Sequence, residues 1–112
     1  FLGLHTERRH DRRFDAEGAW LVCNGHRLPV ADLSLSGVRV RHAPTMLRPG
    51  QQVDFALDLP MPGRPLSVHG RAQVVRIGPG EFALCYSTLD HRLLRTLHFF
   101  LGGRRPVGNP PH

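Results

Sequence analysis

The chain contains no lysine, because all 15 of its Lys and Arg residues are arginine, and with nine acidic residues they give a formal net charge of +6. Aromatic residues make up only 7% of the chain, with one tryptophan and one tyrosine. No apolar run reaches the roughly 18 residues that a membrane-spanning helix needs. The sequence therefore predicts no membrane span in this chain, and its charge predicts an anionic partner of unspecified kind.

The spacings typical of catalytic and metal-binding sites are also missing. The eight histidines form no H-x-x-x-H pair, and the two cysteines form no C-x-x-C pair. Neither the phosphate loop G-x-x-x-x-G-K-[ST] nor the nucleophile elbow G-x-S-x-G occurs. We therefore expect no enzyme, no metal site and no catalytic cofactor.

The two cysteines, Cys23 and Cys85, lie in apolar strand-like segments. We interpret both as small buried hydrophobic residues rather than as a disulfide or reactive thiols, which indicates a reducing compartment. The first residue is Phe1 and no signal-peptide pattern follows it. We expect a cytoplasmic protein, or the cytoplasmic part of a longer one.

Apolar and polar residues alternate in short segments separated by turn residues, as is typical of antiparallel strands. We predict strands over residues 20–23, 26–30, 38–41, 52–59, 66–74 and 82–86. Asn24-Gly25 favours a type I′ hairpin turn, and Gly70 predicts a close approach of backbone. Arg39 and Arg41 are expected to point outward. Trp20 and the Phe99-Phe100 pair are expected in the core.

The apolar spacing changes to a helical period after the last strand. Leu93, Leu97 and Leu101 recur on one helix face, with Asp90 or Thr88 as the predicted N-cap and Gly102-Gly103 as the stop. A chain of 112 residues with 40% hydrophobic content forms one domain. We divide it into a mobile arginine-rich arm (1–13), a barrel with its C-terminal helix (14–101) and a loose tail (102–112).

Six short antiparallel strands and one C-terminal helix give a mainly β fold. Strands so few and so short predict a small closed or nearly closed barrel. Composition alone leaves a split α+β sheet equally open.

Two motifs about twenty residues apart indicate the ligand: the R-x-x-x-R of Arg9 and Arg13, and the D-x-S-x-x-G of Asp32, Ser34 and Gly37. Guanidinium groups bind phosphate or the O6/N7 edge of guanine, while a carboxylate accepts from guanine N1–H and N2–H₂. Asp32 and Ser34 also suit local hydrogen bonds within a turn. Gly37 either has a positive φ or lets a base lie directly on backbone.

With this pair of motifs, from about Glu7 to Leu101, the chain resembles the PilZ family. The resemblance implies a small β-barrel and cyclic di-GMP as the ligand, bound through Arg9, Arg13, Asp32, Ser34 and Gly37. An arginine directly before R-x-x-x-R, here Arg8, goes in that family with binding of a self-stacked cyclic di-GMP dimer.

The function predicted from these residues is a non-catalytic receptor. The arginine arm folds over cyclic di-GMP on the barrel surface, and its change of position passes to an attached domain or a partner protein. Two alternatives stay open. A basic barrel that binds RNA or single-stranded DNA would fit the charge, but exposed stacking aromatics are not evident. A PilZ-like interaction module that binds no nucleotide would not need both motifs intact.

Overall fold

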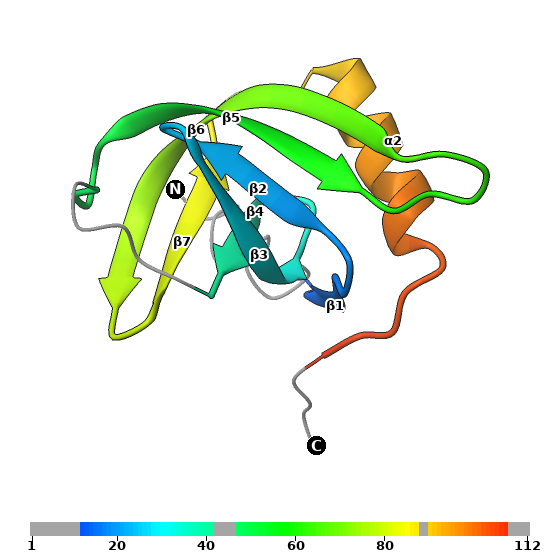
Figure 1. Ribbon diagram of the computed structural model, residues 1–112, viewed down its shortest axis with the longest axis horizontal. Coiled ribbons are helices and arrows are strands. Elements are labelled where there is room, and N and C mark those ends of the chain that lie inside the picture. The colour runs from blue at the N-terminus through cyan, green and yellow to red at the C-terminus, as the bar shows by residue number, and fades with distance from the viewer. Residues whose placement is uncertain (1–11, 42–46, 88–89, 108–112) are drawn as a thin grey trace, which may run out of the picture.

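The computed structural model describes residues 12–41, 47–87 and 90–107. Its elements run in the order β1 (Phe14–Asp15), β2 (Trp20–Cys23), β3 (His26–Leu33), β4 (Gly37–Val40), β5 (Gln52–Leu59), β6 (Leu66–Gly78), β7 (Glu81–Tyr86) and α2 (His91–Leu101). Figure 1 shows the strands curling around one interior, with α2 lying across one end.

Six strands, β2 to β7, form a closed antiparallel barrel. The sheet order is β1-β3-β2-β5-β6-β7-β4, and an additional pairing of β3 with β4 closes the circle. The first half of β3 pairs with β2, and its second half pairs with both β4 and the two-residue β1. The predicted six-stranded barrel with one C-terminal helix is confirmed. The short β1 was not predicted.

The barrel interior follows the predicted alternation. Val53, Phe55, Leu57 and Leu59 of β5 are all buried, while the residues between them are not. Gly70 of β6 makes room for the Phe55 ring, since a Cβ there would lie 2.9 Å from Phe55 Cζ. Removing such apolar surface from water stabilises a fold by roughly 25 cal/mol per Å². The buried core therefore stabilises the barrel.

Asn24 and Gly25 join β2 to β3 as predicted, with positive φ values of 51° and 79°. Both central residues of a type I′ turn need a positive φ. The turn fixes the register of the two strands, which places Trp20 opposite Pro29 on the outer face.

Three residues expected in the core lie instead on the outside. Cys85 is exposed because the neighbouring Leu84 and Tyr86 point inward. Trp20 is only half-buried, since Leu21 occupies the interior position beside it. Phe99 is 70% exposed on α2. The residue type had suggested the core in each case. The alternation of side chains along β2 and β7, and the helical period of α2, place these three side chains on the outer side instead.

The helix α2 begins where the sequence predicted. Asp90 is its N-cap, because Leu93 N donates to Asp90 Oδ1 at 2.8 Å. Thr88, the alternative, lies outside the described residues. The buried residues of α2 include Leu93, Leu97 and Phe100, and the helix packs against β6. No helix in the described ranges is long and apolar enough to cross a membrane.

After α2 the chain returns to β1. Asp15 N donates to Arg105 O at 2.8 Å, and Val107 N donates to Arg13 O at 2.9 Å. Phe14 and Pro106 form an antiparallel bridge between these two bonds. Arg105 and Val107, within the segment predicted to be a loose tail, are thus hydrogen-bonded to Asp15 of β1 and to Arg13, the last residue of the predicted arm.

Candidate ligand-binding site

Asp32 lies near the end of β3, between Arg39 of β4 on one side and Asp15 of β1 on the other. Its side chain is only 3% exposed. Both carboxylate oxygens accept from guanidinium groups: Oδ1 from Arg13 Nε, and Oδ2 from Arg39 Nε and Nη2 at 2.9 and 2.7 Å. A buried carboxylate needs such partners, because burial without them is strongly unfavourable.

Arg13 joins the two motifs in space. Besides its bond to Asp32, its Nη1 lies 3.5 Å from Ser34 Oγ. The residues are 19 and 21 positions apart in the chain, so only the fold brings them together. Of the three arm residues predicted to bind the ligand, Arg13 lies beside Asp32, whereas Arg8 and Arg9 lie outside the described residues.

Arg39 is the site residue that sequence reasoning missed. It was predicted only to point outward, but it pairs with Asp32 and also with Glu81 of β7, whose Oε1 lies 3.2 Å from its Nη1. The hydrogen bond to Asp32 raises the pKa of Arg39 above its ordinary value. The pairing of Arg39 with Asp32 could have been predicted from the hairpin register, because a turn over Ser34–Gly37 places residue 39 opposite residue 32.

Ser34 holds the turn that carries the second motif. Its side chain is fully buried, and its Oγ accepts from Ser36 N at 3.2 Å and Gly37 N at 3.1 Å. The same hydroxyl donates to Gly37 O at 3.3 Å. Local hydrogen bonding, one of the two roles considered for this residue, is therefore present. A contact of Ser34 with a ligand stays a prediction.

Gly37 has a different structural reason from the expected positive φ. Its φ is not among the positive values of the described glycines, so that expectation was wrong. A Cβ on Gly37 would instead lie 2.2 Å from Leu84 O, a backbone atom of β7. Glycine is needed here because β4 and β7 approach closely at this position. A contact between Gly37 and a base stays a prediction.

Metal binding has no support in the described part of the chain. No group of three or more His, Cys, Asp or Glu residues there is placed to hold an ion. Of the two cysteines, Cys23 is buried, and burial raises the pKa of its thiol.

The structure thus places Arg13 of the first motif beside Asp32 and Ser34 of the second, on the outside of a small closed barrel. The sequence model of the PilZ domain matches residues 7–103, and the chain belongs to the PilZ family. PilZ domains form a family of cyclic di-GMP receptors and are generally non-catalytic receptor or effector modules. Comparison with curated proteins gave no match.

Solved structures show the same fold. The Bacillus subtilis inhibitor of motility (MotI/DgrA) is 20% identical with a TM-score of 0.74, over 84% of this chain and 49% of that chain. The chain thus spans about half the length of the Bacillus protein. An uncharacterised Legionella protein is 13% identical with a TM-score of 0.61, over 80% of this chain and 89% of that one.

The PilZ domain of CeSA from a cellulose-synthesising bacterium is 13% identical with a TM-score of 0.54, over 82% of this chain and 91% of that chain. At these identities the three likenesses establish the fold.

Proposed function

We propose that this chain is a cyclic di-GMP receptor that binds the messenger through Arg8, Arg9, Arg13, Asp32, Ser34 and Gly37. The observation that carries the proposal is the pairing of Arg13 with Asp32. It unites the two sequence motifs in one site on the outer face of the barrel. Guanidinium groups supply donors for phosphate and for the guanine O6/N7 edge, and the carboxylate supplies acceptors for N1–H and N2–H₂.

We infer that binding at Asp32 exchanges its partners, because the carboxylate is only 3% exposed and is covered by two guanidinium groups. Both of its oxygens already accept from guanidinium groups, Oδ1 from Arg13 and Oδ2 from Arg39. A guanine that donates to Oδ1 replaces Arg13, which then turns to a phosphate or to the Hoogsteen edge of the base. Arg39 stays on Oδ2 and keeps the buried carboxylate paired during the exchange.

The exchange of partners at Asp32 is the step that transmits ligand binding to other segments of the chain. The carbonyl of Arg13 accepts from Val107 N, and Asp15 N donates to Arg105 O. A movement of Arg13 therefore acts on both the N-terminal arm and the segment after α2. An attached domain or a partner protein at either segment would sense occupancy of the site.

Titration calorimetry tests this function, with cyclic di-GMP compared against GTP, GMP and a short oligonucleotide. We expect saturable binding of cyclic di-GMP alone, retained at several hundred millimolar salt. Oligonucleotide affinity falls steeply with salt because many counterions are released, whereas the messenger has only two phosphates. Strongly salt-dependent oligonucleotide binding with no response to cyclic di-GMP would instead support the nucleic-acid alternative. Binding of none of the four would support the interaction module.

A further inference from the structure

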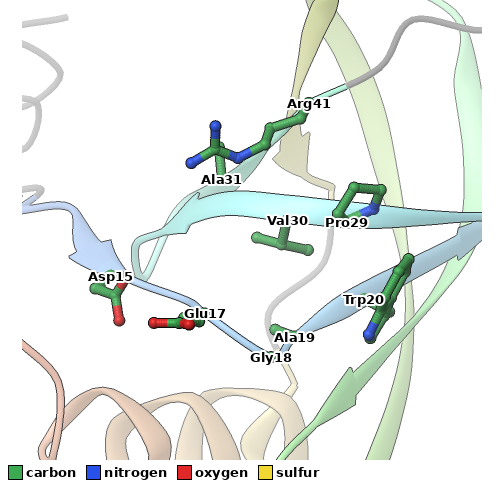
Figure 2. Close-up of a pocket in the computed structure, with 9 residues that line it drawn as sticks. All are labelled: Asp15, Glu17, Gly18, Ala19, Trp20, Pro29, Val30, Ala31 and Arg41. Carbon is green, nitrogen blue, oxygen red and sulfur yellow. The ribbon is translucent and has the colours of Figure 1, made fainter.

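We call the site formed by Arg13, Asp32, Ser34 and Gly37 the motif site. A hollow of about 340 Å³ lies beside it on the outer face of the barrel. Figure 2 shows it between the segment from β1 to β2 and the end of β4, with β3 crossing it. Asp15 and Glu17 stand on one side, Arg41 stands on the other, and Trp20 stands at one end.

The hollow shares a wall with the motif site. Asp15, which lines the hollow, is the β1 partner of Asp32 in the strand register. Ala31, at the register shift in β3, also lines it and directly precedes Asp32. Paired residues of antiparallel strands have Cα atoms roughly 5 Å apart. The hollow is therefore close enough to Asp32 for one dinucleotide to occupy both places.

The charged groups of the hollow suit a base with both donors and acceptors. In the described ranges, neither Arg41 nor Glu17 forms an ion pair through its side chain, whereas Asp15 is paired with Arg104 at 3.4 Å. A guanidinium donates to guanine O6 and N7, while a carboxylate accepts from N1–H and N2–H₂. These two pairs of atoms lie on neighbouring edges of guanine, the Hoogsteen edge and the Watson–Crick edge, and Arg41 and Glu17 line different sides of the hollow.

Trp20 adds an aromatic wall. Its indole lines the hollow, and the guanidinium carbon of Arg27 lies 4.3 Å from its ring centroid. This cation–π contact and the ion pair of Arg27 with Asp58 at 3.7 Å hold the ring in position. A fixed aromatic ring at the end of a base-sized hollow favours stacking with a planar ligand.

We propose that the hollow binds the second guanine of the cyclic di-GMP molecule whose first guanine is bound at Asp32. Glu17 reads N1–H and N2–H₂, Arg41 reads O6 and N7, and Trp20 stacks with the base. This inference rests on the proposed function. It adds to that function a selectivity for guanine at both base positions of the ligand.

The test uses 3′,3′-cyclic GMP-AMP, which can place its one guanine at Asp32 and must then present adenine to the hollow. Adenine lacks the N1–H and N2–H₂ donors that Glu17 would accept. We expect the protein to bind cyclic di-GMP about tenfold or more tightly than the mixed dinucleotide, as the loss of a bidentate base contact predicts. Calorimetry measures both affinities.

Two variants locate the effect. Glu17→Gln and Arg41→Ala should each reduce the preference for cyclic di-GMP toward the roughly twofold value that its two equivalent guanines give by statistics. Arg64→Ala removes the same charge as Arg41→Ala from an exposed position in the β5–β6 connection and should retain the full preference. Thermal unfolding checks that all three variants fold.

Wild-type affinities within about twofold of each other would overturn the inference while leaving the proposed function intact. An unchanged preference in Glu17→Gln and Arg41→Ala would likewise overturn it. Failure of cyclic di-GMP to bind at all would overturn the proposed function as well.

Discussion

The motif site and the hollow lie side by side on one outer face, yet their charges are arranged differently. At the motif site Asp32 is buried and both of its oxygens are paired with arginines. At the hollow, within the described ranges, Arg41 and Glu17 form no ion pair. On the proposed function, a ligand displaces Arg13 at the first place and meets accessible charges at the second. We therefore propose that the first place drives a conformational response and that the second provides selectivity.

The largest expected effect concerns the turn that carries the motif site. In Gly37→Ala the new Cβ would lie 2.2 Å from the backbone oxygen of Leu84, which cannot move without opening the β4–β7 pairing. We expect the free energy of unfolding to fall by about 3 kcal/mol, in the upper range for overpacking. Urea denaturation measures it.

Gly78→Ala is the matched control for that change. Its nearest neighbour would be Glu81 Cγ at 3.9 Å, an ordinary contact. Its stability should remain close to wild type. Equal stability of the two variants would show that the close approach of β4 and β7 does not require glycine at position 37.

The next effect separates the arginines of the arm. Arg9→Ala or Arg13→Ala should weaken cyclic di-GMP binding more than tenfold, because a lost charge-assisted contact costs roughly 1.5–3 kcal/mol. Arg12 is exposed and adjacent, so Arg12→Ala removes the same charge and should bind nearly as wild type does. If calorimetry gives either Arg9→Ala or Arg13→Ala wild-type affinity, the arm does not hold the ligand as proposed.

A smaller effect on stability distinguishes Arg39 of β4 from Arg41, which directly follows that strand. Arg39→Ala leaves Asp32 Oδ2 without the partner described here, and we expect the free energy of unfolding to fall by about 1 kcal/mol, since Arg39 is itself partly exposed. Arg41→Ala, two residues along the chain, should change it by less than about 0.5 kcal/mol. Chemical denaturation of both variants decides the comparison. Equal values would show that the Arg39–Asp32 pair does not stabilise the fold.

The smallest effect concerns stoichiometry. Two stacked messengers bring four phosphates and four guanines together, and Arg8 would offset the repulsion and stack on a base. The wild-type protein should then bind two ligands per chain, and Arg8→Leu should bind nearer to one while retaining the Arg9 and Arg13 contacts. One ligand per chain in both proteins would exclude this role for Arg8.

Features governed by local periodicity could be predicted from the sequence. The six barrel strands, the Asn24-Gly25 turn and the Asp90 cap depend on neighbouring residues, so their patterns can be read directly. Strand β1 could not be predicted, because two residues carry no periodicity and the strand exists only by pairing with β3. Trp20 and Cys85 were misplaced because residue type was weighed above strand alternation.

The sequence predicted candidate residues for the site, but it did not predict how these residues contact one another. The motifs identify Arg13 and Asp32 as candidates, but the direct bond between them depends on how β1 docks against β3. Arg39 was missed for the same reason, since its partner across the hairpin follows from register. Gly37 was expected to have a positive φ or to contact a base, whereas the structural reason for glycine is the close approach of β7, a tertiary contact that local sequence does not encode.

The central claim is that messenger binding exchanges the partner of Asp32 Oδ1. Side-chain NMR of the arginine Nε–H groups tests it most directly during titration with cyclic di-GMP, with the Arg13 signal assigned from its absence in Arg13→Lys. We predict that the Arg13 signal shifts in proportion to saturation. The signal of Arg71, which pairs with the exposed Asp54 at 3.2 Å, should stay fixed. Saturation by cyclic di-GMP with an unchanged Arg13 signal would contradict the account.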